Sequence, residues 1–140
     1  MVAAFVLQWC LQVPADAAWA AAGRGWGVVD PVAGGLSFSV APGYPYPVRA
    51  RLRVPPTATR DPTDVERSHA AYLDAGRRFA EAYDPGVRVG PYQRRAMVDD
   101  VWAMAESEAL GRRPPPRASC CFIYVLPGAH ECAGCPRLRP

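Results

Sequence analysis

The chain of 140 residues contains no lysine and no asparagine, and all 16 of its basic residues are arginine. Such a bias is typical of a GC-rich genome, so a single arginine is weak evidence for function. The sequence also has no apolar run of the roughly 20 residues that a membrane-spanning helix needs. Its formal net charge of +3 is too small to indicate a nucleic-acid partner. With 50% hydrophobic and 21% charged residues, the composition indicates a globular protein and excludes disorder along the whole length.

Cysteine is scarce in most of the chain, since four of the five cysteines fall within the last 21 residues. A disulfide framework would spread cysteines along the sequence to close long loops, so this clustering favours a metal site. The spacing is C-C-x10-C-x2-C, and thiolates are soft ligands that select zinc, cuprous copper or iron–sulfur clusters. We expect Cys10, which stands alone, to be an inert buried thiol. The candidate metal ligands are Cys120, Cys121, Cys132 and Cys135.

Hydrophobic periodicity predicts an α+β fold for residues 1–111. Residues 1–22 favour a buried helix over a secretory signal, because a basic leader is missing and polar residues interrupt the apolar run. We expect Pro14 to end or kink this helix. Alternation at 36–40 and 48–54 predicts a small antiparallel β ribbon whose second strand carries three arginines on one face. Two longer helices are expected at 63–83 and 92–110, with Gly111 capping the second. The predicted core stripe of the first of these helices is Val65, Tyr72, Phe79 and Tyr83, and that of the second is Met97, Val101, Met104 and Ala105.

Residues 112–140 are predicted to form a separate C-terminal segment, which begins with a proline linker. The run of three prolines at 114–116 cannot continue a helix and favours an extended, semi-rigid chain. Between the two cysteine pairs lie an apolar stretch, 122–126, expected to be a short strand, and a turn at Pro127-Gly128. A cysteine-rich hairpin of this length would bring the two pairs together.

The adjacency of Cys120 and Cys121 bears on the identity of the metal. Zinc sites usually separate paired cysteines by two to four residues, so that both reach one tetrahedral ion. Neighbouring side chains on an extended chain point to opposite faces. A two-iron cluster offers two metal centres to four thiolates and accommodates adjacent cysteines more readily. The spacing therefore favours iron–sulfur over zinc, while a structural zinc site that makes the chain a binding module stays open.

This segment resembles the C-terminal motif of the FhuF-type ferric-siderophore reductases, which carry a [2Fe–2S] cluster on a C-C-x10-C-x2-C motif. The similarity covers roughly 25 residues and includes Arg117, Ser119, Tyr124, the Pro127-Gly128 turn and Pro136. The resemblance implies that Cys120, Cys121, Cys132 and Cys135 are the cluster ligands. Members of the family are usually longer, with an N-terminal half that has no counterpart here. A short or truncated relative that acts only as an electron carrier is therefore an alternative.

The resemblance implies an oxidoreductase that reduces ferric siderophore iron to ferrous iron by one-electron transfer and so releases iron inside the cell. Its partners would be a ferric siderophore and an electron donor that the motif does not identify. We expect a cytoplasmic location, since reduced thiols and cluster assembly both need it. Arginines at 112, 113, 117, 137 and 139 flank the motif. They are either a solvated basic tail or cations that raise the cluster potential and attract an anionic chelate.

Overall fold

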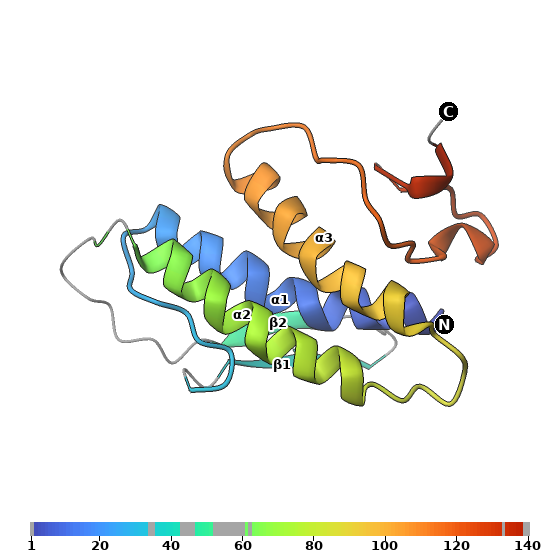
Figure 1. Ribbon diagram of the computed structural model, residues 1–140, viewed down its shortest axis with the longest axis horizontal. Helices are drawn as coiled ribbons and strands as arrows, with labels where there is room; N and C mark the ends of the chain where they lie inside the picture. The colour runs from blue at the N-terminus through green and yellow to red at the C-terminus, as the bar shows by residue number, and fades with distance from the viewer. Residues whose placement is uncertain are drawn as a thin grey trace.

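The computed structural model describes residues 2–33, 36–42, 47–51, 61, 63–132 and 134–138. In chain order the elements are helix α1 (Ala3–Gly23), strands β1 (Ser37–Val40) and β2 (Pro47–Arg51), helices α2 (Asp64–Ala82) and α3 (Pro91–Ala109), and the 3-10 turns η1 (Ile123–Val125) and η2 (Pro136–Leu138). Each helix packs against the other two, and β2 contacts α1. After α3 the chain turns back and runs beside that helix (Figure 1). The predicted α+β fold is confirmed.

Of the two expectations for Pro14, an end or a kink, the end is wrong, because helix α1 continues through this proline. A proline inside a helix removes one backbone hydrogen bond and crowds the preceding turn. Tertiary packing offsets that cost here, because Leu7, Leu11 and Ala15 are fully buried on either side of the proline. The apolar face of α1 packs against both α2 and α3, and this packing keeps the helix continuous across Pro14.

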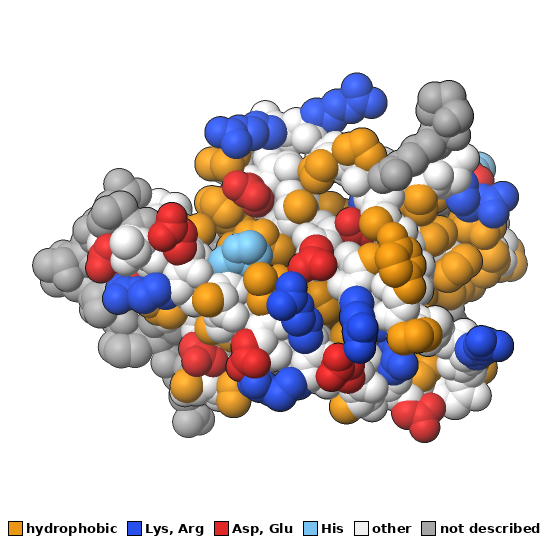
Figure 2. Space-filling model, in the orientation of Figure 1, with side chains coloured by type: hydrophobic (Ala, Val, Ile, Leu, Met, Phe, Trp, Pro, Cys, Tyr) orange, Lys and Arg blue, Asp and Glu red, His pale blue; other side chains and the backbone are white. Residues whose placement is uncertain are grey.

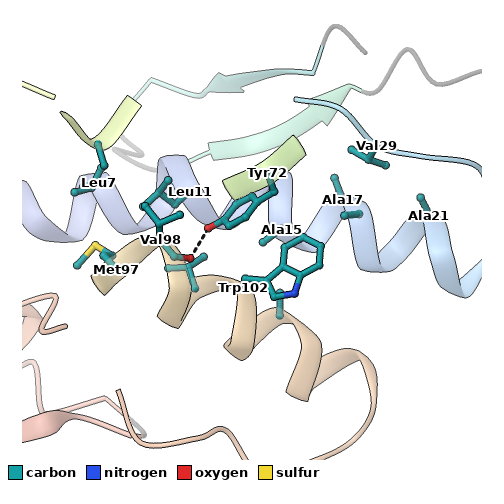
Figure 3. Packing of buried hydrophobic residues seen from close by; sticks show 14 of the residues in the cluster. Leu7, Leu11, Ala15, Ala17, Ala21, Val29, Tyr72, Met97, Val98 and Trp102 are labelled. Atoms are coloured by element: carbon teal, nitrogen blue, oxygen red, sulfur yellow. Dashed lines mark hydrogen bonds between the residues drawn. The ribbon is translucent and has the colours of Figure 1, made fainter. Parts of the chain in front are cut away.

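The core lies between the three helices and is centred on Tyr72 of α2 (Figure 3). The Tyr72 hydroxyl is buried and donates a hydrogen bond to the backbone oxygen of Val98 in α3, at 3.0 Å. Its ring stands 5.1 Å from the ring of Trp102. A Cβ added to Gly76, one turn further along α2, would lie 3.0 Å from Val98 Cγ1. The absence of a side chain at Gly76 therefore lets α2 approach α3 closely.

The buried face of α2 differs from the predicted stripe. Phe79 is 42% exposed, and Val65 and Tyr83 are only partly buried. The contact line instead follows every fourth residue, and most of its side chains are small: Asp64, Ser68, Tyr72, Gly76 and Ala80. Small residues allow close helix approach, which apolar periodicity alone does not reveal. On α3, Met97, Val101 and Ala105 are buried as predicted, whereas Met104 is only partly buried.

The predicted antiparallel ribbon is confirmed over β1 and β2, with Ser37 opposite Arg51 and a bulge between Ser39 and Val40. Arg49 and Arg51 are exposed, whereas residues 52–54 of the predicted second strand lie outside the described residues. The end of α3 is also as predicted. Gly111 has a φ of 63°, and the Arg112 amide reaches back to the Ser107 oxygen at 2.7 Å. Glycine adopts this left-handed conformation without strain, so it fits the C-terminal cap.

Acidic and basic side chains are interspersed on the face shown in Figure 2. Two exposed ion pairs link α2 to α3: Arg77 with Asp99 at 3.5 Å, and Arg95 with Glu81 at 3.3 Å. Exposed pairs of this kind contribute little to stability. Among the described residues, no helix is both long enough and apolar enough to cross a membrane.

Candidate metal centre

The C-terminal segment that carries the four clustered cysteines, called the cysteine tail below, is held against the middle of α3 by Asp100. Its carboxylate accepts three hydrogen bonds, from the Ala118 amide at 3.1 Å, the Ser119 amide at 2.6 Å and the Ser119 hydroxyl at 2.6 Å. The Asp100 side chain is only 13% exposed, and its Oδ2 lies 4.0 Å from Nε of Arg117. One carboxylate of the helical body thus fixes the backbone immediately before Cys120.

A second attachment follows two helical turns away, where the Gln93 side chain donates to the backbone oxygen of Cys120. Beyond this point the chain reverses at Phe122, whose φ of 57° is left-handed. The expected strand at 122–126 is therefore wrong. Residues Ile123–Val125 form one 3-10 turn, closed by hydrogen bonds from the amides of Val125 and Leu126. With no partner strand alongside it, the segment satisfies its backbone groups locally. The Pro127-Gly128 turn is confirmed by a φ of 76° at Gly128 and a hydrogen bond from Ala129 to Leu126.

The four tail cysteines come together as two close pairs of thiols. The Sγ atoms of Cys121 and Cys132 are 3.8 Å apart. The thiols of Cys120 and Cys135 lie close enough to interact electrostatically. All four are free thiols, and Cys120, Cys121 and Cys135 are buried. Among the described residues, no three histidine, cysteine or acidic side chains converge on a single metal position.

Two N–H groups point at the sulfur atoms. The Phe122 amide lies 3.4 Å from Cys120 Sγ, and Arg117 Nη1 lies 3.6 Å from Cys132 Sγ. Arg117 is 1% exposed and also donates to the hydroxyl of Ser119, which is fully buried. Hydrogen bonds to thiolate sulfur raise the reduction potential of an iron–sulfur centre, so these donors are placed where they would tune one.

Gly134, which lies between the last two cysteines, holds the tail against Arg117. It has a φ of 75°, and its backbone oxygen accepts a hydrogen bond from the Arg117 amide at 3.1 Å. A Cβ at this position would lie 3.2 Å from the backbone oxygen of Pro115. Glycine is therefore required here both by its conformation and by the close approach of the linker.

Without a metal, the thiols of Cys120 and Cys132 are protonated at neutral pH. Burial raises the pKa of Cys132 to about 11, assisted by the neighbouring Cys121, whereas the Arg117 charge acts in the opposite direction. Burial also raises the pKa of Cys120, and the Phe122 amide opposes that shift. Soft metals bind the thiolate form, so metal binding at this site must release protons.

The remaining candidates lie away from the thiols or on the surface. Cys10 is only partly buried, which corrects the expectation of a buried thiol, and lines an apolar hollow of about 310 Å³ between α1, α2 and β1. His130 is exposed. Arg137 is exposed, stacks 4.5 Å above the Tyr124 ring and lies 4.0 Å from the Glu131 carboxylate. Arg112 and Arg113 are exposed, and Arg139 lies outside the described residues.

Sequence reasoning missed Asp100 and Gln93, because they belong to a helix whose polar residues all resemble a solvated face. Their separation of seven residues was the available signal, since it places both on one side of a helix. The sequence alone gave no indication that this side contacts the tail.

Residues 117–137 match the family model described as the FhuF 2Fe-2S C-terminal domain. The matched range begins at Arg117 and includes all four clustered cysteines. The match supports the FhuF-type resemblance for this part of the chain and suggests an iron–sulfur protein related to siderophore-iron reductases. Neither a curated protein nor a solved structure matches the chain.

Proposed function

We propose that residues 112–140 bind a [2Fe–2S] cluster through Cys120, Cys121, Cys132 and Cys135, supported by the helical body of residues 1–111. We further propose that the protein is a cytoplasmic reductase that passes single electrons to the iron of a ferric siderophore. The observation that carries the proposal is the gathering of four free thiols into two close pairs within the segment that matches the 2Fe-2S family model.

The thiol geometry fits the proposed group. Two thiolates about 2.3 Å from one tetrahedral metal ion lie about 3.8 Å apart. The Sγ atoms of Cys121 and Cys132 have that separation. Two such pairs, each coordinating one iron, would make all four cysteines ligands.

The chain's own residues would control the charge around the centre. When bound, a [2Fe–2S] cluster supplies a store for one electron. Arg117 places a buried positive charge against Cys132 Sγ, which favours the more negative, reduced state. Cys132 is the one ligand that is only partly buried, so this edge of the site is nearest to solvent.

The substrate's chemistry explains why one electron is sufficient. Ferric iron is a hard ion that siderophore oxygens hold tightly, whereas ferrous iron has a lower charge density and binds the same oxygens more weakly. The reaction needs neither a general base nor a nucleophile. It needs a site near the surface that an anionic chelate can approach, and Phe122, Val125 and Leu138 of this segment are exposed.

The first experiment establishes the cofactor. Anaerobically purified protein should be red-brown and contain about two irons and two acid-labile sulfides per chain. Cys10→Ala is the matched control and should keep the colour, whereas Cys132→Ser should lose it or make it labile, because an alkoxide is a poor substitute for a soft thiolate. Stoichiometric zinc without sulfide would instead support a zinc-stapled binding module.

The second experiment establishes the activity. Pre-reduced protein is mixed in a stopped-flow instrument with ferric hydroxamate or catecholate chelates and a ferrous trap. Oxidation should exceed that in buffer alone, and its rate should fall with salt if arginines guide an anionic chelate, since screening acts over about 10 Å at 0.1 M ionic strength. An intact cluster that transfers no electron to any chelate would rule out the reductase and favour an electron carrier.

A further inference from the structure

We infer that the four cysteines act as two unequal pairs, Cys121 with Cys132 on one iron and Cys120 with Cys135 on the other, and that Arg117 favours reduction of the iron held by the first pair. The inference rests on the proposed cluster. Beyond the presence of a cluster, it assigns the ligands that share each metal and the metal that gains the electron.

The pairing follows from the positions of the thiols. The Sγ atoms of Cys121 and Cys132 already have the spacing of two thiolates on one tetrahedral ion, about 3.8 Å. With Cys121 and Cys132 on one iron, Cys120 and Cys135 remain for the other, and their thiols lie close enough to interact electrostatically. Each pair therefore combines one residue from the adjacent cysteines with one from the Cys132-x2-Cys135 turn.

The backbone around the adjacent cysteines supports the same division. Asp100 holds the chain at Ser119, and the Phe122 amide turns back onto Cys120 Sγ at 3.4 Å. The Phe122 amide thus contacts Cys120 Sγ, while Cys121 Sγ contacts Cys132 Sγ. The two adjacent thiols therefore have different partners, as ligands of two different metals would.

The two pairs differ in their electrostatic surroundings. The Arg117 guanidinium lies 3.6 Å from Cys132 Sγ and is 1% exposed, so solvent screens its charge little. The Asp100 carboxylate is bound to Ser119, the residue next to Cys120. Asp100 Oδ2 lies 4.0 Å from Arg117 Nε, so the two side chains form one ion pair whose positive end faces Cys132 and whose negative end is bound to Ser119. This orientation makes the added electron more stable on the Cys121–Cys132 iron.

Other charges near the tail are weaker or better screened. Glu131 precedes Cys132, but its carboxylate is 36% exposed and lies 4.0 Å from Arg137 Nε, which compensates it. The first turn of α3 approaches Cys120 through Gln93. A helix N-terminus carries only about half a positive charge, whereas the Arg117 guanidinium itself contacts Cys132 Sγ.

The redox step is balanced without a proton or a change in bonding. One sulfur dioxide radical anion, formed when dithionite dissociates, would give up one electron and become sulfur dioxide. Cys121 and Cys132 would hold the iron that takes up this electron and becomes ferrous, whereas Cys120 and Cys135 would hold the iron that stays ferric. The charge of the centre falls by one unit beside the Arg117 cation.

The pairing is tested in two ways. In iron-57 Mössbauer spectra, Cys121→Ser/Cys132→Ser should alter one iron and leave the other as in the wild type, whereas Cys120→Ser/Cys132→Ser should alter both. The opposite result would overturn the pairing. Should the double variants fail to assemble, mild oxidation of the wild-type apoprotein and peptide mapping decide the question. Disulfides 121–132 and 120–135 support the pairing, and any other pattern contradicts it.

The inequality of the pairs is tested by redox titration. Arg117→Gln should lower the equilibrium constant for reduction at least tenfold, or 59 mV, whereas Arg137→Gln, which removes an exposed charge, should change it much less. Arg117→Lys should restore most of the loss by returning the charge. In Mössbauer spectra of reduced protein, Cys132→Ser should alter the ferrous site and Cys135→Ser the ferric site.

Equal shifts for Arg117→Gln and Arg137→Gln, or a ferrous site altered by Cys135→Ser, would overturn the assignment while leaving the cluster in place. Absence of iron and sulfide from the wild-type protein would instead refute the proposed function itself, so the two failures are distinguishable.

Discussion

Removal of the Asp100 carboxylate should release the cysteine tail from the helical body. Three hydrogen bonds converge on this carboxylate, and its charge faces the buried Arg117 guanidinium. Asp100→Ala leaves that cation buried without its carboxylate partner, a change that costs about 3–5 kcal/mol. The hydrogen bonds are part of this cost and are not added to it. Each 1.36 kcal/mol is a factor of ten, so the docking equilibrium should weaken roughly 150- to 5,000-fold.

The loss should be local, because Asp100 is not one of the residues that form the helical core. We expect far-ultraviolet circular dichroism to keep its helical signal, while the amides of Ala118 and Ser119 lose their protection in hydrogen-exchange mass spectrometry. In the loaded protein, the half-life of the cluster against an iron chelator should shorten strongly. Asp100→Asn should be intermediate, since the amide oxygen still accepts hydrogen bonds but carries no charge.

Asp99→Ala is the matched control on the same helix. The Asp99 side chain is 61% exposed and pairs with an exposed arginine at 3.5 Å, so its removal should cost no more than about 1 kcal/mol. If Asp100→Ala and Asp99→Ala change amide exchange and cluster lifetime equally, the tail does not depend on the Asp100 carboxylate and the reasoning is refuted.

Three further predictions concern the helical body. Tyr72→Phe removes the hydrogen bond to Val98 and should lower the free energy of unfolding in urea by about 1 kcal/mol, and an unchanged midpoint would contradict it. Gly76→Ala gains about 1 kcal/mol of helix propensity but places a methyl group 3.0 Å from Val98, so we expect a net thermal destabilisation. Partial burial and Glu108 raise the pKa of Asp16 from 3.8 to about 6, so the folded state binds more protons than the unfolded state and stability falls as pH rises from 4 to 6. Neighbouring protein atoms desolvate the Asp16 carboxyl, but solvent still reaches this side chain and screens its charge. Asp16→Asn should therefore stabilise the protein at pH 7 by less than about 1 kcal/mol and flatten this slope in thermal melts.

Local sequence signals were sufficient for the secondary structure of the body. The prolines and glycines at helix ends, such as Gly111, and the alternation in β1 and β2 act through the backbone of a few neighbouring residues, so they can be read without the fold. Pro14 shows the limit of such signals. Its cost to α1 is local, but the packing of Leu11 and Ala15 that offsets this cost comes from α2 and α3.

For the candidate site, the sequence alone determined the residue types and their spacing. The clustering of four cysteines in the last 21 residues indicates a soft-metal centre wherever the segment lies, because thiolate chemistry is a property of the side chains themselves. The length of the spacer between the two cysteine pairs also predicted that the two halves of the motif meet. It left open whether the flanking arginines were equivalent.

Only the tertiary structure distinguished those arginines and located their partners. Arg117 is buried against Cys132, whereas Arg137 lies exposed on Tyr124, although both flank the motif in sequence. The difference arises because Asp100, 17 residues earlier on α3, binds the backbone at Ser119 and encloses the guanidinium between the helix and the cysteine turn. Burial and charge pairing depend on segments that are distant in the chain, so the packing of α3 against the tail, and no local pattern, decided which cation acts on the thiols.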